Sequence, residues 1–134
     1  MIEKSIWDKV VEIECELELS EEVMKCIDDK VDFLNCQEQK VKSFINLYIT
    51  NQIVININEE IAAEGKVFLS DATELSSPIT IKQVEEAIYP LYFLMDHEFE
   101  LLIDFDTKPD YLQGHLATLV VKQNNALHFG GING

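Results

Sequence analysis

The sequence contains no arginine: all ten of its basic residues are lysines, set against 25 aspartates and glutamates. The guanidinium group recognises phosphate and guanine through two parallel hydrogen bonds, so its absence argues against a nucleotide or nucleic-acid ligand. The formal net charge of −15 also repels phosphate backbones and attracts cationic surfaces. We therefore expect no binding to nucleic acid. A protein with a basic surface is the partner that this charge favours, unless the acidity serves solubility alone.

Cysteine is scarce and the apolar runs are short. Cys15, Cys26 and Cys36 are odd in number and show neither C-x-x-C nor Cys/His ligand spacing, which fits a reducing compartment and excludes a disulfide framework. Asparagines interrupt the longest apolar stretch, so no segment approaches the ~20 residues of a membrane span. Residues 1–9 lack a basic start followed by an apolar run, as a secretory signal would require. We expect a soluble, cytoplasmic protein without a membrane partner.

Glycine and proline are also few, five and three in 134 residues, which leaves no room for a low-complexity linker. With 47% hydrophobic residues the chain has an ordinary globular composition. We expect a single domain over residues 1–134. The sequence does not indicate an oligomeric state.

Residues 11–19 alternate strictly between apolar and acidic side chains, which predicts a strand with one buried face. Four glutamates, Glu12, Glu14, Glu16 and Glu18, would then share the exposed face. Residues 2–7 are expected to pair with this strand through a turn near Asp8-Lys9.

Helices are predicted to follow. Ser20 is a candidate N-cap for a helix over about 21–34, which would bury Val23, Ile27, Val31 and Leu34. A second helix begins near residue 38 and runs into the low 50s. Residues 53–57 are β-branched enough for a strand, but the sequence up to Gly65 favours helix. Thr80 and Gln83 form a capping box with Ile79 and Val84 at staple positions, which predicts a short helix over 81–88.

The last third is predicted to be β. Residues 89–95 and 99–106 form a hairpin with Pro90 at its start or on an edge, and strands 116–122 and 126–130 follow. The fold class is therefore α+β. We expect an antiparallel sheet, made of the N-terminal strand and a C-terminal four-stranded meander, with two or three helices packed on one face.

One constellation has the residue types of a catalytic or metal site, namely Asp104, Asp106, Asp110 and His115. Carboxylates and an imidazole bind divalent ions or share acid–base work when the fold brings them together. No nucleophile elbow or phosphate loop accompanies them, and Pro109 and Asp110 are also ordinary turn formers. His97 is expected in a solvated turn and His128 in a half-buried structural position. We expect no enzyme, no metal and no cofactor.

The acidic strand is the least ordinary feature of the sequence. Like charges at every second position of a strand repel one another, and a cationic partner would relieve that repulsion. Protection of a sheet edge against aggregation is the competing explanation. The candidate partner-binding residues are Glu12, Glu14, Glu16, Glu18, Glu100, Asp104 and Asp106. The aromatic residues, Tyr92 among them, are expected in the core, and Cys15 and Cys26 are expected as small buried groups.

The C-terminal pattern consists of Ile103-Asp104-Phe105-Asp106, then Tyr111-Leu112-Gln113-Gly114-His115, a strand over 116–121 and a closing Gly130-Gly131. It resembles a group of small bacterial domains of unknown function that place a Gly-His step before their penultimate strand. The order over about 11–131 is similar to theirs, although the Trp-Asp and Glu that precede Gly-His in some relatives are absent. Such domains are similar to proteins found beside polymorphic toxins, which are thought to include immunity proteins. The resemblance therefore implies a function of that kind. From the residues themselves, Gly114 fits a tight turn and His115 the start of a strand.

Three functions stay open at this point. The leading hypothesis is a stoichiometric inhibitor, or immunity protein, whose acidic surface blocks a basic toxin, plausibly a nuclease. The second is an adaptor or assembly module of unknown partner whose acidity serves solubility. The third is a metal-dependent enzyme built on the aspartates and His115.

Overall fold

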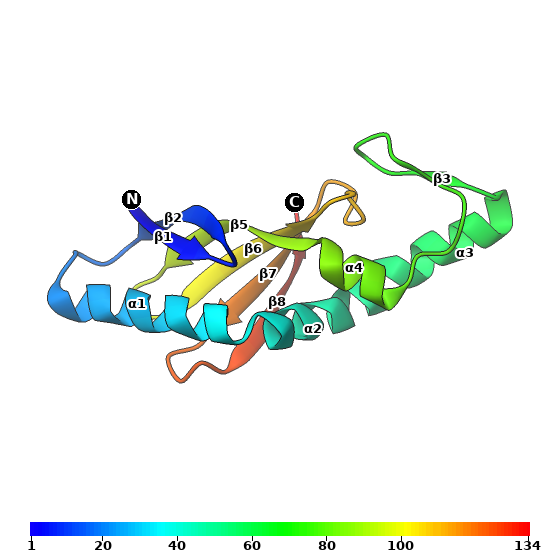
Figure 1. Cartoon of the computed structure of the whole chain (residues 1–134). Coiled ribbons are helices and arrows are strands. Elements are labelled where there is room, and N and C mark those ends of the chain that lie inside the picture. The colour runs from blue at the N-terminus through cyan, green and yellow to red at the C-terminus, as the bar shows by residue number, and fades with distance from the viewer.

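The computed structural model describes residues 1–134 and shows the predicted α+β class. A six-stranded sheet has the order β1-β2-β5-β6-β7-β8, and helices α1 (Glu21–Cys36) and α2 (Glu38–Ile49) run along one side of it (Figure 1). The strands of this sheet are β1 (Ile2–Ile6), β2 (Lys9–Cys15), β5 (Ile88–Met95), β6 (Leu101–Thr107), β7 (Leu116–Val121) and β8 (Leu127–Asn133). No helix of the structure is both long enough and apolar enough to cross a bilayer.

The N-terminal hairpin of β1 and β2 is confirmed, with Ile2 opposite Ile13 and Ile6 opposite Lys9. Its turn lies one residue earlier than expected, at Trp7 and Asp8, whose φ angles of 52° and 64° match the strand twist of a two-residue hairpin. Strand β2 ends at Cys15, so the predicted strand over 11–19 is too long. Glu16 and Glu18 are exposed but lie beyond the strand.

One pair of strands differs from the expected antiparallel arrangement. Strand β2 lies parallel to β5, and only Ile13 to Cys15 pair with Phe93 to Met95. A parallel neighbour needs a long crossover, and here all the helices lie within that connection. The start of β5 has no partner on the β2 side. Pro90, which has no N–H to donate, lies there, as predicted.

The helical segment contains α1 (Glu21–Cys36), α2 (Glu38–Ile49), a π-helical turn η1 (Thr50–Val54) and α3 (Ile55–Glu64). Ser20 caps α1 by accepting from the Val23 N–H, and the four apolar residues predicted to be buried in α1 are buried. Residues 53–57 are helical, so the strand alternative is wrong. Gly65, at φ 82°, ends α3.

Helix α4 (Ile81–Ala87) begins with the predicted capping box. The Gln83 N–H donates to Thr80 Oγ1 over 3.1 Å, and the Thr80 N–H donates to Gln83 Oε1 over 2.8 Å. Before α4, the short strands β3 (Val67–Phe68) and β4 (Glu74–Leu75) form a separate hairpin, which extends beyond the main sheet together with α3 (Figure 1).

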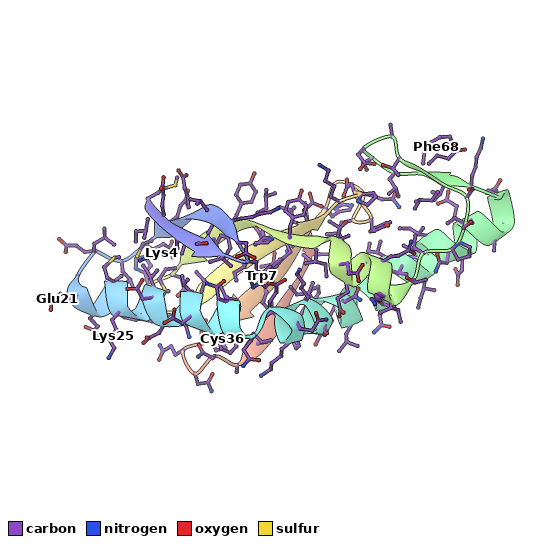
Figure 2. All side chains as sticks on the ribbon, viewed as in Figure 1. Lys4, Trp7, Glu21, Lys25, Cys36 and Phe68 are labelled. Carbon is purple, nitrogen blue, oxygen red and sulfur yellow. The ribbon has the colours of Figure 1, made fainter.

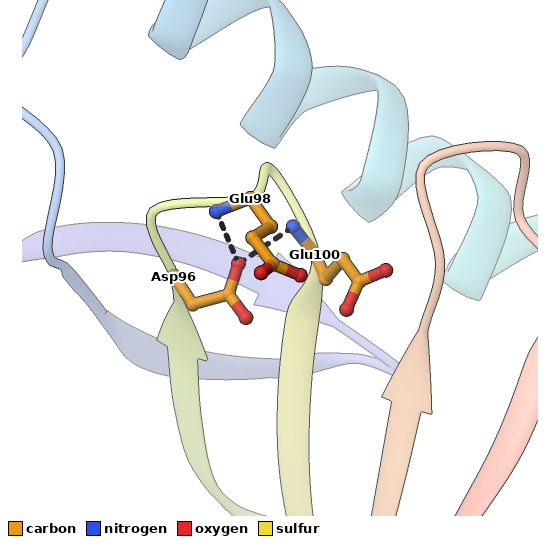
Figure 3. Close-up of side chains that lie close together, drawn as sticks. All are labelled: Asp96, Glu98 and Glu100. Carbon is orange, nitrogen blue, oxygen red and sulfur yellow. Dashed lines mark hydrogen bonds between the residues drawn. The ribbon is translucent and has the colours of Figure 1, made fainter.

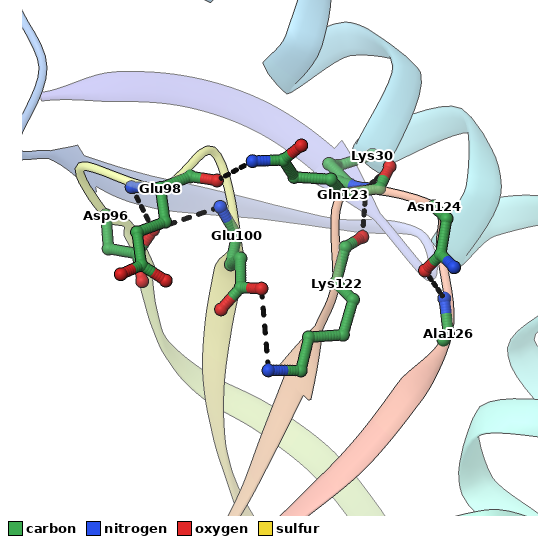
Figure 4. Close-up of polar contacts among 8 residues, drawn as sticks. All are labelled: Lys30, Asp96, Glu98, Glu100, Lys122, Gln123, Asn124 and Ala126. Atoms are coloured by element: carbon green, nitrogen blue, oxygen red, sulfur yellow. Dashed lines mark hydrogen bonds and ion pairs between the residues drawn. The ribbon is translucent and has the colours of Figure 1, made fainter.

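A lysine lies inside the interface between α1 and the sheet. Lys30 is only 3% exposed, and its ammonium donates to Lys122 O at 2.5 Å, to Gln123 O at 3.0 Å and to Asn125 Oδ1 at 2.6 Å. Figure 4 shows it reaching the turn between β7 and β8. Burial lowers the pKa of Lys30, because a desolvated ammonium is less stable than a hydrated one. This side chain therefore fastens α1 to the far hairpin.

Trp7 fastens the C-terminal end of α1 to the N-terminal hairpin. Its indole N–H donates to Leu34 O over 2.8 Å, and its ring centroid lies 5.7 Å from that of Phe105. In Figure 2 the labelled Trp7 lies between the hairpin and the C-terminal end of α1. Lys4, on the same hairpin, pairs with Asp28 of α1 at 2.6 Å.

Candidate functional site

The sheet face opposite α1 and α2 is covered by no helix (Figure 1). Along each strand the residues of this face alternate with the buried residues of the core. We call it the open face. It consists of Glu3, Val10, Glu12, Glu14, Tyr92, Leu94, Leu102, Asp104, Asp106, Thr118 and Val120.

The centre of the open face is apolar. Leu94 pairs with Leu102, and Leu102 pairs with Val120, so the three side chains form a row across β5, β6 and β7. Val10 and Tyr92 beside this row are 75% and 60% exposed. The prediction that Tyr92 belongs to the core is therefore wrong. A shallow groove of about 630 Å³ runs between β2 and β6 over this surface.

Carboxylates surround the apolar row on its β2 side. Glu3 and Glu12 lie directly opposite each other in the register of β1 and β2, and Glu14 lies opposite Leu94. All three are exposed and none forms an ion pair. A directly opposed pair of like charges destabilises a hairpin, so a cationic partner would gain from meeting it.

The other predicted acidic residues divide into two groups. Asp104 and Asp106 lie half-buried on the open face, where Asp104 Oδ1 accepts from Thr118 Oγ1 over 2.6 Å. Glu100 is not free in the same way, because its largely covered side chain lies 3.5 Å from the Lys122 ammonium (Figure 4). The structure thus places Glu12, Glu14, Asp104 and Asp106 on one surface.

The proposed metal or acid–base set of Asp104, Asp106, Asp110 and His115 is not assembled. No three of these groups have ligand atoms within 4.8 Å of one another. His115 is exposed and its backbone N–H donates to Leu112 O, while Asp104 faces Thr118. Asp106 and Asp110 do meet, beside Tyr89.

Burial raises the pKa of Asp106, and the neighbouring charge of Asp110 raises it further, against a hydrogen bond from the Thr107 N–H that lowers it. In the folded state this carboxyl therefore keeps its proton to a higher pH than its ordinary pKa of 3.8 would allow. Its ionisation lowers the folding stability as the pH rises through the raised pKa.

We expect Asp106→Asn to stabilise the fold near pH 7, with the gain vanishing below about pH 4. Urea unfolding at both pH values checks this. The exposed Asp32→Asn serves as the charge control, and an Asp106→Asn gain that is equal at both pH values would contradict the assignment.

Asp96, Glu98 and Glu100 are the one acidic group close enough to hold a metal ion (Figure 3). The Asp96 carboxylate accepts the backbone N–H groups of Glu98 and Glu100 over 2.9 and 3.0 Å. Such bonds are the usual role of an aspartate in a turn. Together with the bond from Gln123 to Glu98 O, they explain this cluster as the structure of the β5–β6 turn.

Of the remaining predictions for single residues, some are confirmed and some are wrong. His97 lies exposed in the predicted turn, but His128 is exposed and not half-buried. Gly114 adopts φ 89° in a turn, as predicted. Cys15 and Cys26 are half-buried, Cys36 is exposed, and all three are free thiols.

No protein-family model, curated protein or solved structure matches this chain.

The helices contain two buried polar residues that the sequence analysis does not predict, Lys30 and Asn46. Lys30 lies three residues after Ile27, and Asn46 lies three residues before Ile49, so each falls on the apolar stripe of its helix. A polar residue on an apolar stripe is the signal that would have found both.

Proposed function

We propose that this protein binds a basic protein partner stoichiometrically through the open face and thereby blocks it, as an immunity or inhibitor protein blocks a toxin. The observation that carries the proposal is the apolar row of an uncovered sheet face bordered by carboxylates that have no ion-pair partner. The partner is a toxin with a cationic active-site surface, such as a nuclease, since an acidic face competes for the place of a phosphate backbone.

The two kinds of side chain on this face have different roles in binding. Exposed apolar and aromatic groups such as Tyr92 and Val10 provide surface to bury, and aromatic residues dominate the energy of many interfaces. The carboxylates raise the rate of encounter with a basic surface. Because they stand on paired strands, these groups are ordered before binding and lose little conformational freedom.

The proposal is tested by charge reversal on the open face. The partner is first isolated from the native host on the tagged parent protein. Its association with the variant Glu12→Lys, Glu14→Lys should then be slower by about ten-fold or more at low salt, with a flatter salt dependence. Stopped-flow or surface-based kinetics measures both. Folding stability should not fall, because the lysine introduced at position 12 would face Glu3 with opposite charge.

The matched control is Glu60→Lys, Glu64→Lys on α3, which makes the same change in net charge at exposed positions far from the open face in the topology. If charge alone steers the partner, both double variants slow association equally, and the open face is not the interface. If only the first variant is slow, the acidic strand is part of the contact.

A further inference from the structure

The acidic residues of this chain are unevenly distributed. None of its 25 aspartates and glutamates falls within residues 39–58 or within residues 111–134. These two segments contain most of α2, the whole of η1, and strands β7 and β8. They also meet in space, because Tyr48 of α2 stacks on Phe129 of β8 with the ring centroids 4.2 Å apart. The surface that they form therefore has no carboxylate side chain of its own.

Strand β8 is one of the two edges of the main sheet (Figure 1). It is the only strand of this sheet without a buried residue, although Leu127, Phe129 and Ile132 are apolar. The Lys122 N–H donates to Ala126 O, so by alternation Leu127 and Phe129 direct their backbone groups away from β7. No residue outside β7 and β8 forms a hydrogen bond to this strand. An edge of this kind is a template for another strand.

The opposite edge, β1, is covered by α1. The Asn35 side-chain amide donates to Ser5 O over 2.9 Å and accepts the Trp7 N–H over 2.9 Å. Lys4 of the same strand pairs with Asp28 of α1 at 2.6 Å. These contacts occupy the outer side of β1, so β8 is the free edge of the sheet.

A small aromatic cluster lies beside this free edge. The ring centroids of Phe44 and Tyr48 are 5.4 Å apart, and the Tyr48 ring lies within 4° of parallel to that of Phe129. None of the three residues is buried, and Tyr48 is 36% exposed. Aromatic rings in this position provide further apolar area to bury when another element meets the edge.

We propose that two copies of this chain pair through β8, antiparallel and about a two-fold axis, so that their sheets join into one. The charges favour a second copy as the occupant. Two chains of net charge −15 repel each other least where carboxylates are absent, since more distant charges are screened by salt. A basic partner would gain no ion pair here and would meet Lys40, Lys42 and Lys122 instead.

The geometry of such a pair follows from its symmetry. A two-fold axis perpendicular to the sheet keeps the helices of both copies on the same side, which brings the two α2 helices and their aromatic clusters toward each other. Because β1 is covered, the pairing closes at two copies and does not continue into a fibre. The open face of each copy stays uncovered, so the pairing is independent of the proposed function.

Sedimentation velocity over a series of protein concentrations tests the pairing. At about 0.15 M salt the parent should shift reversibly from 15.4 kDa toward twice that mass, with a dissociation constant on the order of 10 μM, as suits a small interface. Amide exchange locates the contact. The N–H groups of Leu127 and Phe129 should exchange at least about ten-fold more slowly in the dimer than after dilution to the monomer.

His128→Glu places a carboxylate at an exposed position of β8. It should weaken dimerisation by about five-fold or more, because both copies bring a like charge to the same ladder. Salt at about 1 M should restore part of the affinity. The matched control is His97→Glu, which makes the same change in charge at an exposed position in the β5–β6 turn and should dimerise like the parent.

Leu127→Pro removes one outward N–H, whereas Leu127→Ala keeps it. The proline variant should therefore dimerise about ten-fold more weakly than the alanine variant, since each copy loses a hydrogen bond. If circular dichroism shows that Leu127→Pro does not fold, the comparison of His128→Glu with His97→Glu decides.

Three results would overturn the proposal: a parent that stays monomeric up to about 1 mM, equal weakening in both glutamate variants, or a dimer whose Leu127 and Phe129 amides stay unprotected. The open-face variant Glu12→Lys, Glu14→Lys should dimerise at least as well as the parent. A failure of the pairing is thus distinguishable from a failure of the proposed function.

Discussion

Replacing Lys30 by methionine should lower the free energy of unfolding by about 2 to 4 kcal/mol. Methionine keeps an apolar stem of similar length but removes the ammonium. The Gln123 carbonyl and the Asn125 amide oxygen then have no donor, and the Lys122 carbonyl keeps only the Asn125 N–H. The Lys30 side chain is 3% exposed, so the ammonium is lost from a covered position, where its hydrogen bonds contribute most to stability. Urea unfolding followed by circular dichroism measures the loss.

The control is Lys25→Met, which makes the same change in charge on the same helix at an exposed position. Its effect should stay within about 0.5 kcal/mol. Amide exchange adds a local measurement, because the turn amides of residues 122–126 should lose protection in Lys30→Met and not in Lys25→Met. Equal midpoints for the two variants would show that the Lys30 ammonium does not hold the turn.

Much of the fold could be predicted because it depends on local signals. The caps at Ser20 and Thr80 and the alternation through Ile13 are properties of a few neighbouring residues, and the structure contains all of them. The meander of β5 to β8 also follows from its connections, since consecutive strands joined by short loops usually pair as neighbours.

The parallel contact between β2 and β5 could not be predicted in this way. It joins Ile13 to Phe93 across all the helices, and no pattern within either strand specifies which distant strand lies alongside. The end of β2 at Cys15 has the same cause. The acidic alternation continues to Glu18, but β5 gives β2 a partner only as far as its own end at Met95.

The candidate site was predicted in its chemistry and only partly in its geometry. Excess carboxylate is visible in composition, and Glu12, Glu14, Asp104 and Asp106 do share a surface. The same surface also contains the exposed Tyr92, because no second layer covers this side of the sheet. The residue pattern of a strand does not reveal whether such a layer is present. The aspartates and His115 have the residue types of a site, but Asp104 and Asp106 face the open side while His115 lies in the exposed approach to β7.

Replacing Trp7 by alanine should destabilise the protein by about 2 to 3 kcal/mol, somewhat less than the loss of a fully buried tryptophan. The indole packs on Phe105, its N–H bonds to the Leu34 carbonyl, and the Lys42 ammonium lies 5.0 Å from its ring centroid, so one side chain joins the hairpin to α1 and α2. Position 7 has φ 52°, a conformation that strains any residue with a Cβ atom. Tryptophan and alanine both have a Cβ, so the backbone strain is the same in the parent and in Trp7→Ala.

Trp7→Phe separates the two contributions of the indole. Phenylalanine retains most of the ring contact with Phe105 but loses the hydrogen bond to Leu34 O, so its cost should be about 1 kcal/mol. Tyr92→Ala, an aromatic deletion on the uncovered face, should cost less than Trp7→Ala, because Tyr92 is 60% exposed. Urea unfolding followed by far-ultraviolet circular dichroism compares the three, since Trp7 is the chain's sole tryptophan and its emission is lost in two of them. If Tyr92→Ala proves as costly as Trp7→Ala, the open face contributes as much to the stability of the free protein as the core side of the hairpin does. That result would contradict the view that the open face is a surface left exposed for a partner.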